Sequence, residues 1–193
     1  KYIGEKIKEF EQTGEYQYVF GFEESYGCLS GTYARDKDAV VASLLICEMA
    51  AYYKSQGKTL IDVMNSLYDE FGYYCNTVQS YTFEGAAGME KMAAIMDGLR
   101  DNKPSSFAGY EVTKIDDYKT SKSTIVKTGE KSEITLPKSN VLAYTLTNGN
   151  KVIVRPSGTE PKIKAYITAI GSSEENAKEI VQKLLDDANE LMK

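Results

Sequence analysis

The sequence contains no histidine, and this absence removes several kinds of chemistry at once. Among its 193 residues there is no imidazole to act as a general base, to complete a Ser-His-Asp triad, to carry a phosphoryl group or to bind a metal ion. Any chemistry must therefore use carboxylates, hydroxyls, lysine and arginine.

Cysteine and long apolar runs are also scarce. The three cysteines, Cys28, Cys47 and Cys75, are far apart, odd in number and without C-x-x-C spacing. This argues against a disulfide framework or a zinc site and favours a reducing, cytoplasmic location. The longest apolar run, residues 39–51, contains Glu48 and is too short to span a bilayer, and the charged N-terminus does not read as a signal peptide.

Composition is that of an ordinary globular protein, with 42% apolar and 26% charged residues. The net charge of −5 gives a surface field that repels nucleic acid and anionic membranes, so we expect neither as a partner. A basic site for a small anionic ligand would have to be local. The length allows one large domain or two small ones.

The first part of the chain reads as α/β, with one strand and three helices. The strand is expected over residues 16–23, and the helices over 1–13, from Asp36 or Asp38 to 56, and from Thr59 to 71. The buried faces of the second and third helices are predicted to be Val41, Leu44, Leu45, Met49 and Tyr52, and Ile61, Met64, Leu67, Tyr68 and Phe71.

The second part reads as α+β, and we place the domain boundary between residues 75 and 76, giving domains 1–75 and 76–193. Strands are expected over 77–83, 110–118 and 162–170, together with a hairpin over 141–155. Asn148-Gly149 in this hairpin suits a type I′ turn. Helices are expected over 86–99 and at the C-terminus, where Ser172 and Glu175 form a capping-box pattern.

The loop "RPSGTEPK", residues 155–162, joins two predicted strands and concentrates groups that bind anions. Arg155 offers a planar fork for phosphate oxygens, and the hydroxyls of Ser157 and Thr159 offer further donors. Gly158 would let the backbone turn sharply, so that successive N–H groups point into one concavity. The alternative is a rigid surface turn with incidental polar residues.

Two earlier stretches also carry polar side chains at element ends. In "GFEESYG", residues 21–27, one glutamate could accept hydrogen bonds from vicinal sugar hydroxyls, with the other paired to a cation. In "RDKD", residues 35–38, the cations at a helix N-terminus oppose the helix dipole unless an anion binds there. Solvated carboxylates and simple pairing with the neighbouring aspartates are the alternatives.

These stretches together are more specific than any one alone. "GFEESYG", then "RDKDAVVAS", then "RPSGTEPKIKAY" resembles the C-terminal part of the α-D-phosphohexomutases, the family of phosphoglucomutases and phosphomannomutases. The resemblance covers nearly the whole chain, with the motifs in the family's order. It implies the later part of an α/β third domain, followed by a TBP-like fourth domain whose antiparallel sheet is flanked by helices.

The resemblance also implies site residues. The sugar hydroxyls would be contacted by Glu23 and Ser25, with Glu24 in place of Glu23 if the register differs by one residue. The substrate phosphates would be held by Lys37, Arg155, Ser157, Gly158 and Thr159.

The family's reaction interconverts a sugar 1-phosphate and a sugar 6-phosphate through a bisphosphate of the glucose 1,6-bisphosphate type, using a phosphoserine and Mg²⁺. The family's Thr-Ala-Ser-His-Asn-Pro serine loop requires a histidine, and its Asp-Gly-Asp-x-Asp-Arg magnesium loop is absent. We therefore expect no catalytic or metal-binding residue in this chain and no activity of the chain alone. Its partners would be the sugar phosphate and the missing N-terminal domains of the same polypeptide.

The substrate stays open at this point. Many phosphomannomutase relatives have Ser-Gly-His in the sugar loop, whereas this chain has Ser25-Tyr26-Gly27. That sequence is closer to glucose-specific and phosphopentomutase-like members. A non-catalytic sugar-phosphate-binding module is the alternative from another class, and a nucleic-acid binder is a distant third because no basic stripe is present.

Overall fold

The computed structural model describes residues 2–23, 26–85 and 87–192. They form two compact units, Lys1–Ser66 and Leu67–Lys193. The predicted domain boundary between residues 75 and 76 falls inside strand β3 (Tyr73–Thr82), which belongs to the second unit.

The first unit contains three helices and a two-stranded sheet. Its elements are α1 (Tyr2–Thr13), β1 (Phe20–Phe22), β2 (Cys28–Ser30), α2 (Ala39–Ser55) and the start of α3 (Leu60–Phe71). The strand expected over residues 16–23 is shorter than predicted, and β2 was not predicted. β1 and β2 pair antiparallel, with Gly21 opposite Leu29. Strands of three residues are too short to show a period of two in the sequence.

Asp38, rather than Asp36, caps helix α2. Its backbone is extended, and its carboxylate accepts hydrogen bonds from the N–H groups of Val40 at 2.8 Å and Val41 at 3.2 Å. The Tyr33 hydroxyl donates to the same carboxylate at 2.6 Å. These three donors favour the charged carboxylate, and they lower the pKa of Asp38.

The predicted buried faces of α2 and α3 are wrong for the unit as described. No residue of α2 is buried, and Leu44 and Tyr52 are 59% and 62% exposed. On α3, Ile61 and Met64 are likewise exposed. The reason is that α2 is apolar on all sides, whereas the sheet described in this unit has only two strands of three residues each.

The second unit is built on one antiparallel sheet, as the sequence predicts. Its strands lie in the order β3-β10-β9-β8-β5-β6-β7, with β4 beside β5. After β3 they are β4 (Ser106–Phe107), β5 (Tyr110–Asp117), β6 (Lys122–Ile125), β7 (Lys131–Glu133), β8 (Leu142–Leu146), β9 (Lys151–Pro156) and β10 (Lys162–Gly171). The short strands β4, β6 and β7 were not predicted.

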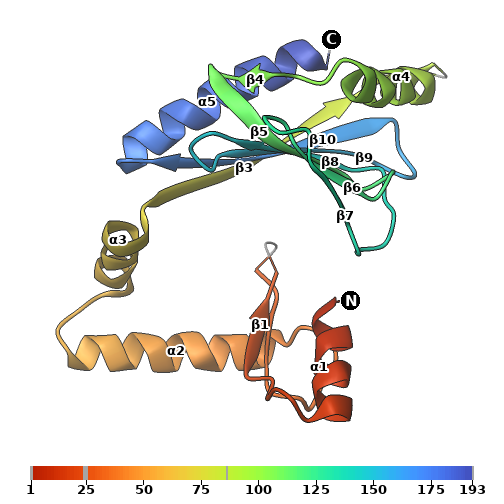
Figure 1. Ribbon diagram of the computed structural model, residues 1–193. Coiled ribbons are helices and arrows are strands. Elements are labelled where there is room, and N and C mark those ends of the chain that lie inside the picture. Colours follow the sequence, from red (N-terminus) through yellow and green to blue (C-terminus); the bar gives the residue numbers. More distant parts are fainter. Residues whose placement is uncertain (1, 24–25, 86, 193) are drawn as a thin grey trace. The chain divides into compact units, whose positions relative to one another are not determined.

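Two helices, α4 (Gly88–Asp101) and α5 (Glu174–Leu191), cover one face of this sheet (Figure 1). On β10, Ile163, Ala165, Ile167 and Ala169 are buried on that face, because alternate side chains of a strand point the same way. Lys164, Tyr166 and Thr168 therefore point to the opposite face. The alternation read from the sequence places both sets correctly.

The hairpin between β8 and β9 forms where predicted but with a different turn. A type I′ turn needs positive φ at two residues, and here Gly149 has it (φ 84°) whereas Asn148 does not. The Leu146 carbonyl accepts from Gly149 N at 3.0 Å, and Leu146 N donates to the Asn150 carbonyl at 2.9 Å. Buried Asn150 also accepts from Ile170 N at 2.8 Å, which ties this longer loop to β10.

The predicted cap of the last helix is displaced by one residue. Ser173, not Ser172, is the N-cap of α5, and its hydroxyl accepts from Asn176 N at 3.1 Å. The Asn176 side chain in turn accepts from Ser172 N at 3.1 Å. Asparagine therefore does here what the capping-box pattern assigned to Glu175.

The cap of α2 gives a pH-dependent prediction. A carboxyl group whose folded-state pKa is lowered stabilises the fold above its unfolded pKa, and this stabilisation is lost as the pH falls through the folded-state pKa. Asp38 should therefore titrate below its ordinary value of 3.8, which carbon NMR of its carboxyl group measures. The protein should lose α2 helicity in circular dichroism as the pH falls below that value.

The matched variants separate the cap from its charge. Asn caps helices about as well as Asp, so Asp38→Asn should keep α2 at neutral pH and reduce its acid sensitivity. Asp38→Ala should lose helicity at every pH. Equal acid sensitivity in the native protein and Asp38→Asn contradicts this account.

Candidate functional site

The loop between β9 and β10 is fixed at both ends by backbone hydrogen bonds. Ser157 N donates to the Lys162 carbonyl at 2.7 Å, and Lys162 N donates to the Glu160 carbonyl at 2.7 Å. The Pro161 carbonyl accepts from Phe83 N at 2.8 Å, which joins the loop to the chain after β3. The predicted anion-binding loop is thus held by hydrogen bonds at the end of two interior strands of the sheet.

The Ser157 side chain organises the backbone inside this loop. Its hydroxyl oxygen accepts from Thr159 N at 3.4 Å and from Glu160 N at 3.2 Å. Two N–H groups therefore converge on one oxygen, as the predicted concavity requires. Because both distances are long, a stronger acceptor such as a phosphate oxygen can compete for the same donors.

Gly158 does not have the conformation that its predicted role requires. Its φ lies outside the left-handed region, and a Cβ added to it has no neighbouring atom within 4 Å. A sharp glycine turn is therefore not what the backbone needs here.

A cavity of about 320 Å³ lies against this loop, lined by Arg155, Ser157, Gly158, Thr159, Lys164 and Tyr166, together with Pro156. Four of the five predicted phosphate-binding residues, Arg155, Ser157, Gly158 and Thr159, are therefore brought together, whereas the fifth, Lys37, belongs to the first unit. Sequence reasoning missed Lys164 and Tyr166. The alternation of β10 placed both on its polar face, but only the register with β9 shows which β9 residues they adjoin.

The cavity carries uncompensated positive charge. Lys164 lies directly opposite Arg155 in the β9–β10 pairing. Within the described ranges, neither side chain has a carboxylate at ion-pair distance. Like charges directly opposite one another destabilise a strand pair, so an anion bound between them would relieve this repulsion.

The second candidate site lies in the first unit, around Lys37. Its ammonium is 2.7 Å from Asp36 Oδ1 and 3.6 Å from Glu23 Oε2. The aliphatic part of Lys37 crosses Gly27, where a Cβ would be 2.7 Å from the lysine Cγ and Cδ. The structure thus brings Glu23 and Lys37 together, while the predicted sugar-binding residues Glu24 and Ser25 lie outside the described residues.

The pairing of Asp36 with Lys37 further stabilises the charged form of both groups. The hydrogen bond with Lys37 lowers the pKa of Asp36, and the same bond raises the pKa of Lys37. Both side chains are therefore charged at neutral pH. Arg35 instead pairs with Glu11 at 2.6 Å and donates to the Thr32 carbonyl at 2.7 Å, so it is bound within the fold.

In the part of the chain that the structure describes, no three histidine, cysteine or acidic side chains gather closely enough to hold a metal ion. None of its helices combines the length and apolar character needed to cross a bilayer. The three cysteines, Cys28, Cys47 and Cys75, are free.

Comparison with known proteins identifies both units. Residues 1–71 match the family "phosphoglucomutase/phosphomannomutase, alpha/beta/alpha domain III", and residues 90–186 match "phosphoglucomutase/phosphomannomutase, C-terminal domain". The chain therefore belongs to the phosphoglucomutase/phosphomannomutase family and corresponds to its C-terminal part. These matches confirm the predicted family and fold class.

Individual relatives agree with this assignment. Phosphoglucomutases of Staphylococcus epidermidis and Staphylococcus aureus are 39% and 40% identical to the chain over 168 residues, which is 87% of its length. The chain spans 30% of the length of these relatives. A crystal structure of the Paramecium exocytosis-sensitive phosphoprotein parafusin, a phosphoglucomutase in its open form, has a TM-score of 0.62 at 16% identity. The matched region includes 98% of this chain and 32% of the parafusin chain. This likeness supports the fold.

The two glycines of the β8–β9–β10 region make a matched stability test. Gly158→Ala introduces no strain or clash, and it restricts the unfolded chain, so the free energy of unfolding should stay unchanged or rise by up to about 1 kcal/mol. Gly149→Ala should lower it, because φ is 84° and the new Cβ would be 3.2 Å from Ile170 Cδ1. Urea unfolding measures both, and a large loss in Gly158→Ala would mean that this glycine is required by the backbone.

Proposed function

We propose that this chain supplies the sugar-contacting and phosphate-binding parts of an enzyme that interconverts a sugar 1-phosphate and a sugar 6-phosphate through a bisphosphate. In this proposal Glu23, Glu24 and Ser25 contact the sugar hydroxyls. The phosphate contacts come from Lys37, Arg155, Ser157, Gly158 and Thr159. The chain positions the substrate and neutralises its charge, and it makes or breaks no bond itself.

The observation that carries the proposal is the cationic cavity beside the β9–β10 loop. Arg155 and Lys164 are opposite each other in the β9–β10 pairing and line one cavity without a carboxylate partner among the described residues, and two loop amides converge on the Ser157 hydroxyl in the same loop. A phosphate dianion satisfies both features, since it accepts a forked pair of hydrogen bonds from arginine and further bonds from N–H groups. A neutral sugar hydroxyl would match the two cations and the loop N–H groups less well than a phosphate does.

The Lys37 cluster supports a complementary role for the first unit. Glu23 is 3.6 Å from the lysine ammonium, which keeps a carboxylate and a cation side by side. Such a pair can accept hydrogen bonds from sugar hydroxyls through the carboxylate and bind an anionic oxygen through the ammonium.

Glucose phosphate is the proposed substrate, because the similar relatives are named phosphoglucomutases. Mannose phosphate and a pentose phosphate, as in a phosphopentomutase-type member, remain the competing substrates. A non-catalytic sugar-phosphate-binding module uses the same contacts but no turnover. Turnover by the parent polypeptide separates that alternative from the mutase.

The catalytic serine and the Mg²⁺ ligands of the parent are proposed to lie outside this chain. The described residues offer no acidic or histidine cluster that fits the ion, so no step is assigned to it here. The exposed apolar faces of α2 and α3 favour burial against further domains of the same polypeptide. The free cysteines favour the cytoplasm.

Substitution of Arg155 tests the phosphate contact in the parent enzyme. Arg155→Ala should lower kcat/KM roughly 10- to 150-fold, because a charge-assisted hydrogen-bond pair is worth about 1.5–3 kcal/mol. Arg155→Lys keeps the positive charge but loses the forked pair of donors, so its kcat/KM should lie between those of the native enzyme and Arg155→Ala. Lys151→Ala is the control, because it removes a cation from the same face of β9 but outside the cavity. If it lowers kcat/KM as much as Arg155→Ala does, the effect comes from overall charge and not from a phosphate contact at Arg155.

The chain by itself should have no mutase activity. Purified chain with Mg²⁺, glucose 1-phosphate and glucose 1,6-bisphosphate should form no glucose 6-phosphate in a dehydrogenase-coupled assay. The physical reason is that the described residues contain no metal-binding cluster that could activate a hydroxyl as a phosphoryl acceptor. Turnover that disappears in Ser157→Ala would assign the phosphoryl acceptor to this chain after all.

A further inference from the structure

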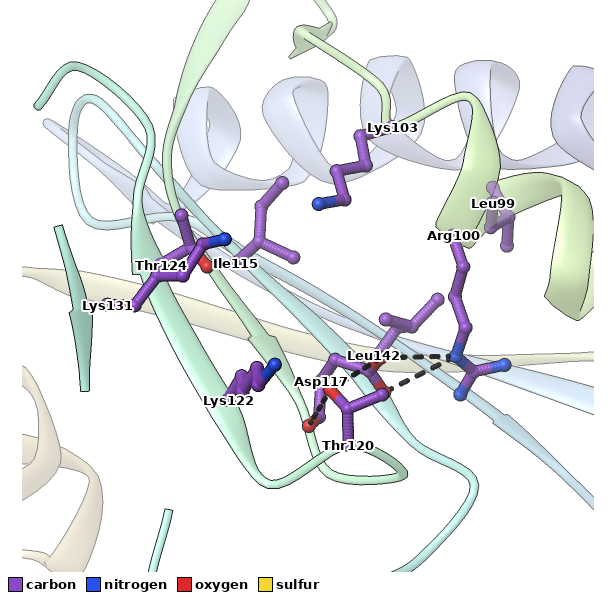
Figure 2. Close-up of a pocket in the computed structure, with 10 residues that line it drawn as sticks. All are labelled: Leu99, Arg100, Lys103, Ile115, Asp117, Thr120, Lys122, Thr124, Lys131 and Leu142. Atoms are coloured by element: carbon purple, nitrogen blue, oxygen red, sulfur yellow. Dashed lines mark hydrogen bonds and ion pairs between the residues drawn. The ribbon is translucent and has the colours of Figure 1, made fainter. Parts of the chain in front are cut away.

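A second cavity, of about 280 Å³, lies in the second unit between the end of α4 and strands β5 to β7. Figure 2 shows its side chains. The apolar side chains of Leu99, Ile115 and Leu142 line it, and Lys103, Lys122 and Lys131 come from three separate segments around them. The ammonium groups of Lys103 and Lys131 point from opposite sides toward Ile115 (Figure 2).

The carboxylate that lines this cavity does not neutralise the lysines. Asp117 has both oxygens 3.3 Å from Arg100 Nε, and it also accepts from Thr120 Oγ1 at 3.1 Å and Lys119 N at 3.0 Å. Arg100 is largely buried and donates further to Asn140 at 2.6 Å. Asp117 therefore forms its interactions with Arg100, Thr120 and the Lys119 amide, and it does not compensate the charges of the lysines that line the cavity.

The strand register brings two of these charges onto one face. Lys131 on β7 lies opposite Thr124 on β6, and Lys122 lies two residues before Thr124 on the same face. Lys122 is opposite Glu133, yet no ion pair forms between them. Across the described chain, Lys103, Lys122 and Lys131 have no carboxylate within ion-pair distance, in a protein whose net charge is −5.

This cavity is separate from the one at the β9–β10 loop. Following the register across the sheet, Thr124 aligns with Ile115, Tyr144, Val152 and Ile167, all on the helix-covered face. Arg155 and Lys164 belong to the alternate set, so they point to the opposite face. The two cationic cavities therefore open on the two sides of one sheet.

We propose that this cavity is a second anion site, which binds a small organic polyphosphate. Three ammonium groups from separate segments can bracket two phosphoryl groups, and the hydroxyl of Thr124 adds a neutral donor. The apolar floor accepts the carbon part of the ligand, which inorganic salts lack. The volume suits a small molecule rather than a macromolecular partner.

Isothermal titration of the whole 193-residue chain with pyrophosphate tests the proposal. Two sites are expected, one of which disappears in Arg155→Ala. In that background, Lys122→Gln with Lys131→Gln should weaken the remaining binding by roughly tenfold or more, and added Lys103→Gln should weaken it further. Lys183→Gln, an exposed lysine on α5 outside both cavities, is the matched control and should change nothing.

Amide NMR spectra locate the bound ion independently of its affinity. In Arg155→Ala, pyrophosphate should shift the Thr124 and Lys131 amide signals. Without pyrophosphate, each variant should give the native spectrum except for residues near its substitution, which establishes that the variant is folded. The proposal is overturned if Arg155→Ala abolishes all pyrophosphate binding. It is equally overturned if the lysine variants bind as tightly as the Lys183→Gln control.

Discussion

The pairing of β10 with β3 on one side and β9 on the other is the constraint on which the second unit depends. Its alternate residues Ile163, Ala165, Ile167 and Ala169 are all buried against α4 and α5. A slip of one residue would move this whole set to the polar face and expose it to water. The same register places Lys164 opposite Arg155, so core packing and the cationic cavity are fixed together.

A sheet covered on one face by helices leaves two different environments for polar groups. On the open face, charged residues beside the β9–β10 loop need no burial, and the loop amides of Thr159 and Glu160 are available next to them. On the helix-covered face, α4 ends at Asp101 while the sheet continues through β6 and β7. Lysines surround the apolar side chains left at that edge, which explains how one small unit holds two cationic cavities.

In the first unit, local polar contacts hold the structure more than buried apolar packing does. Asp38 holds the start of α2, Lys37 crosses Gly27 to reach Glu23, and Arg35 joins Glu11 to the loop. These polar interactions shape the loops although few apolar side chains are buried there. The local polar contacts thus set the geometry of the loops. The stability of the unit depends instead on what covers α2, because a helix that is apolar on all sides needs packing partners on all sides.

The sequence by itself determined the helices, the alternation of β10, the grouping of polar residues in residues 155–162, and the family to which they belong. These depend on local periodicity and on short contiguous motifs. Tertiary structure alone decided that Lys164 faces Arg155, that Asn148 is outside the left-handed region, and that Ser173 rather than Ser172 caps α5. It also decided that Lys103, Lys122 and Lys131 share one cavity, because strand register and helix ends bring together residues whose spacing along the chain carries no such signal.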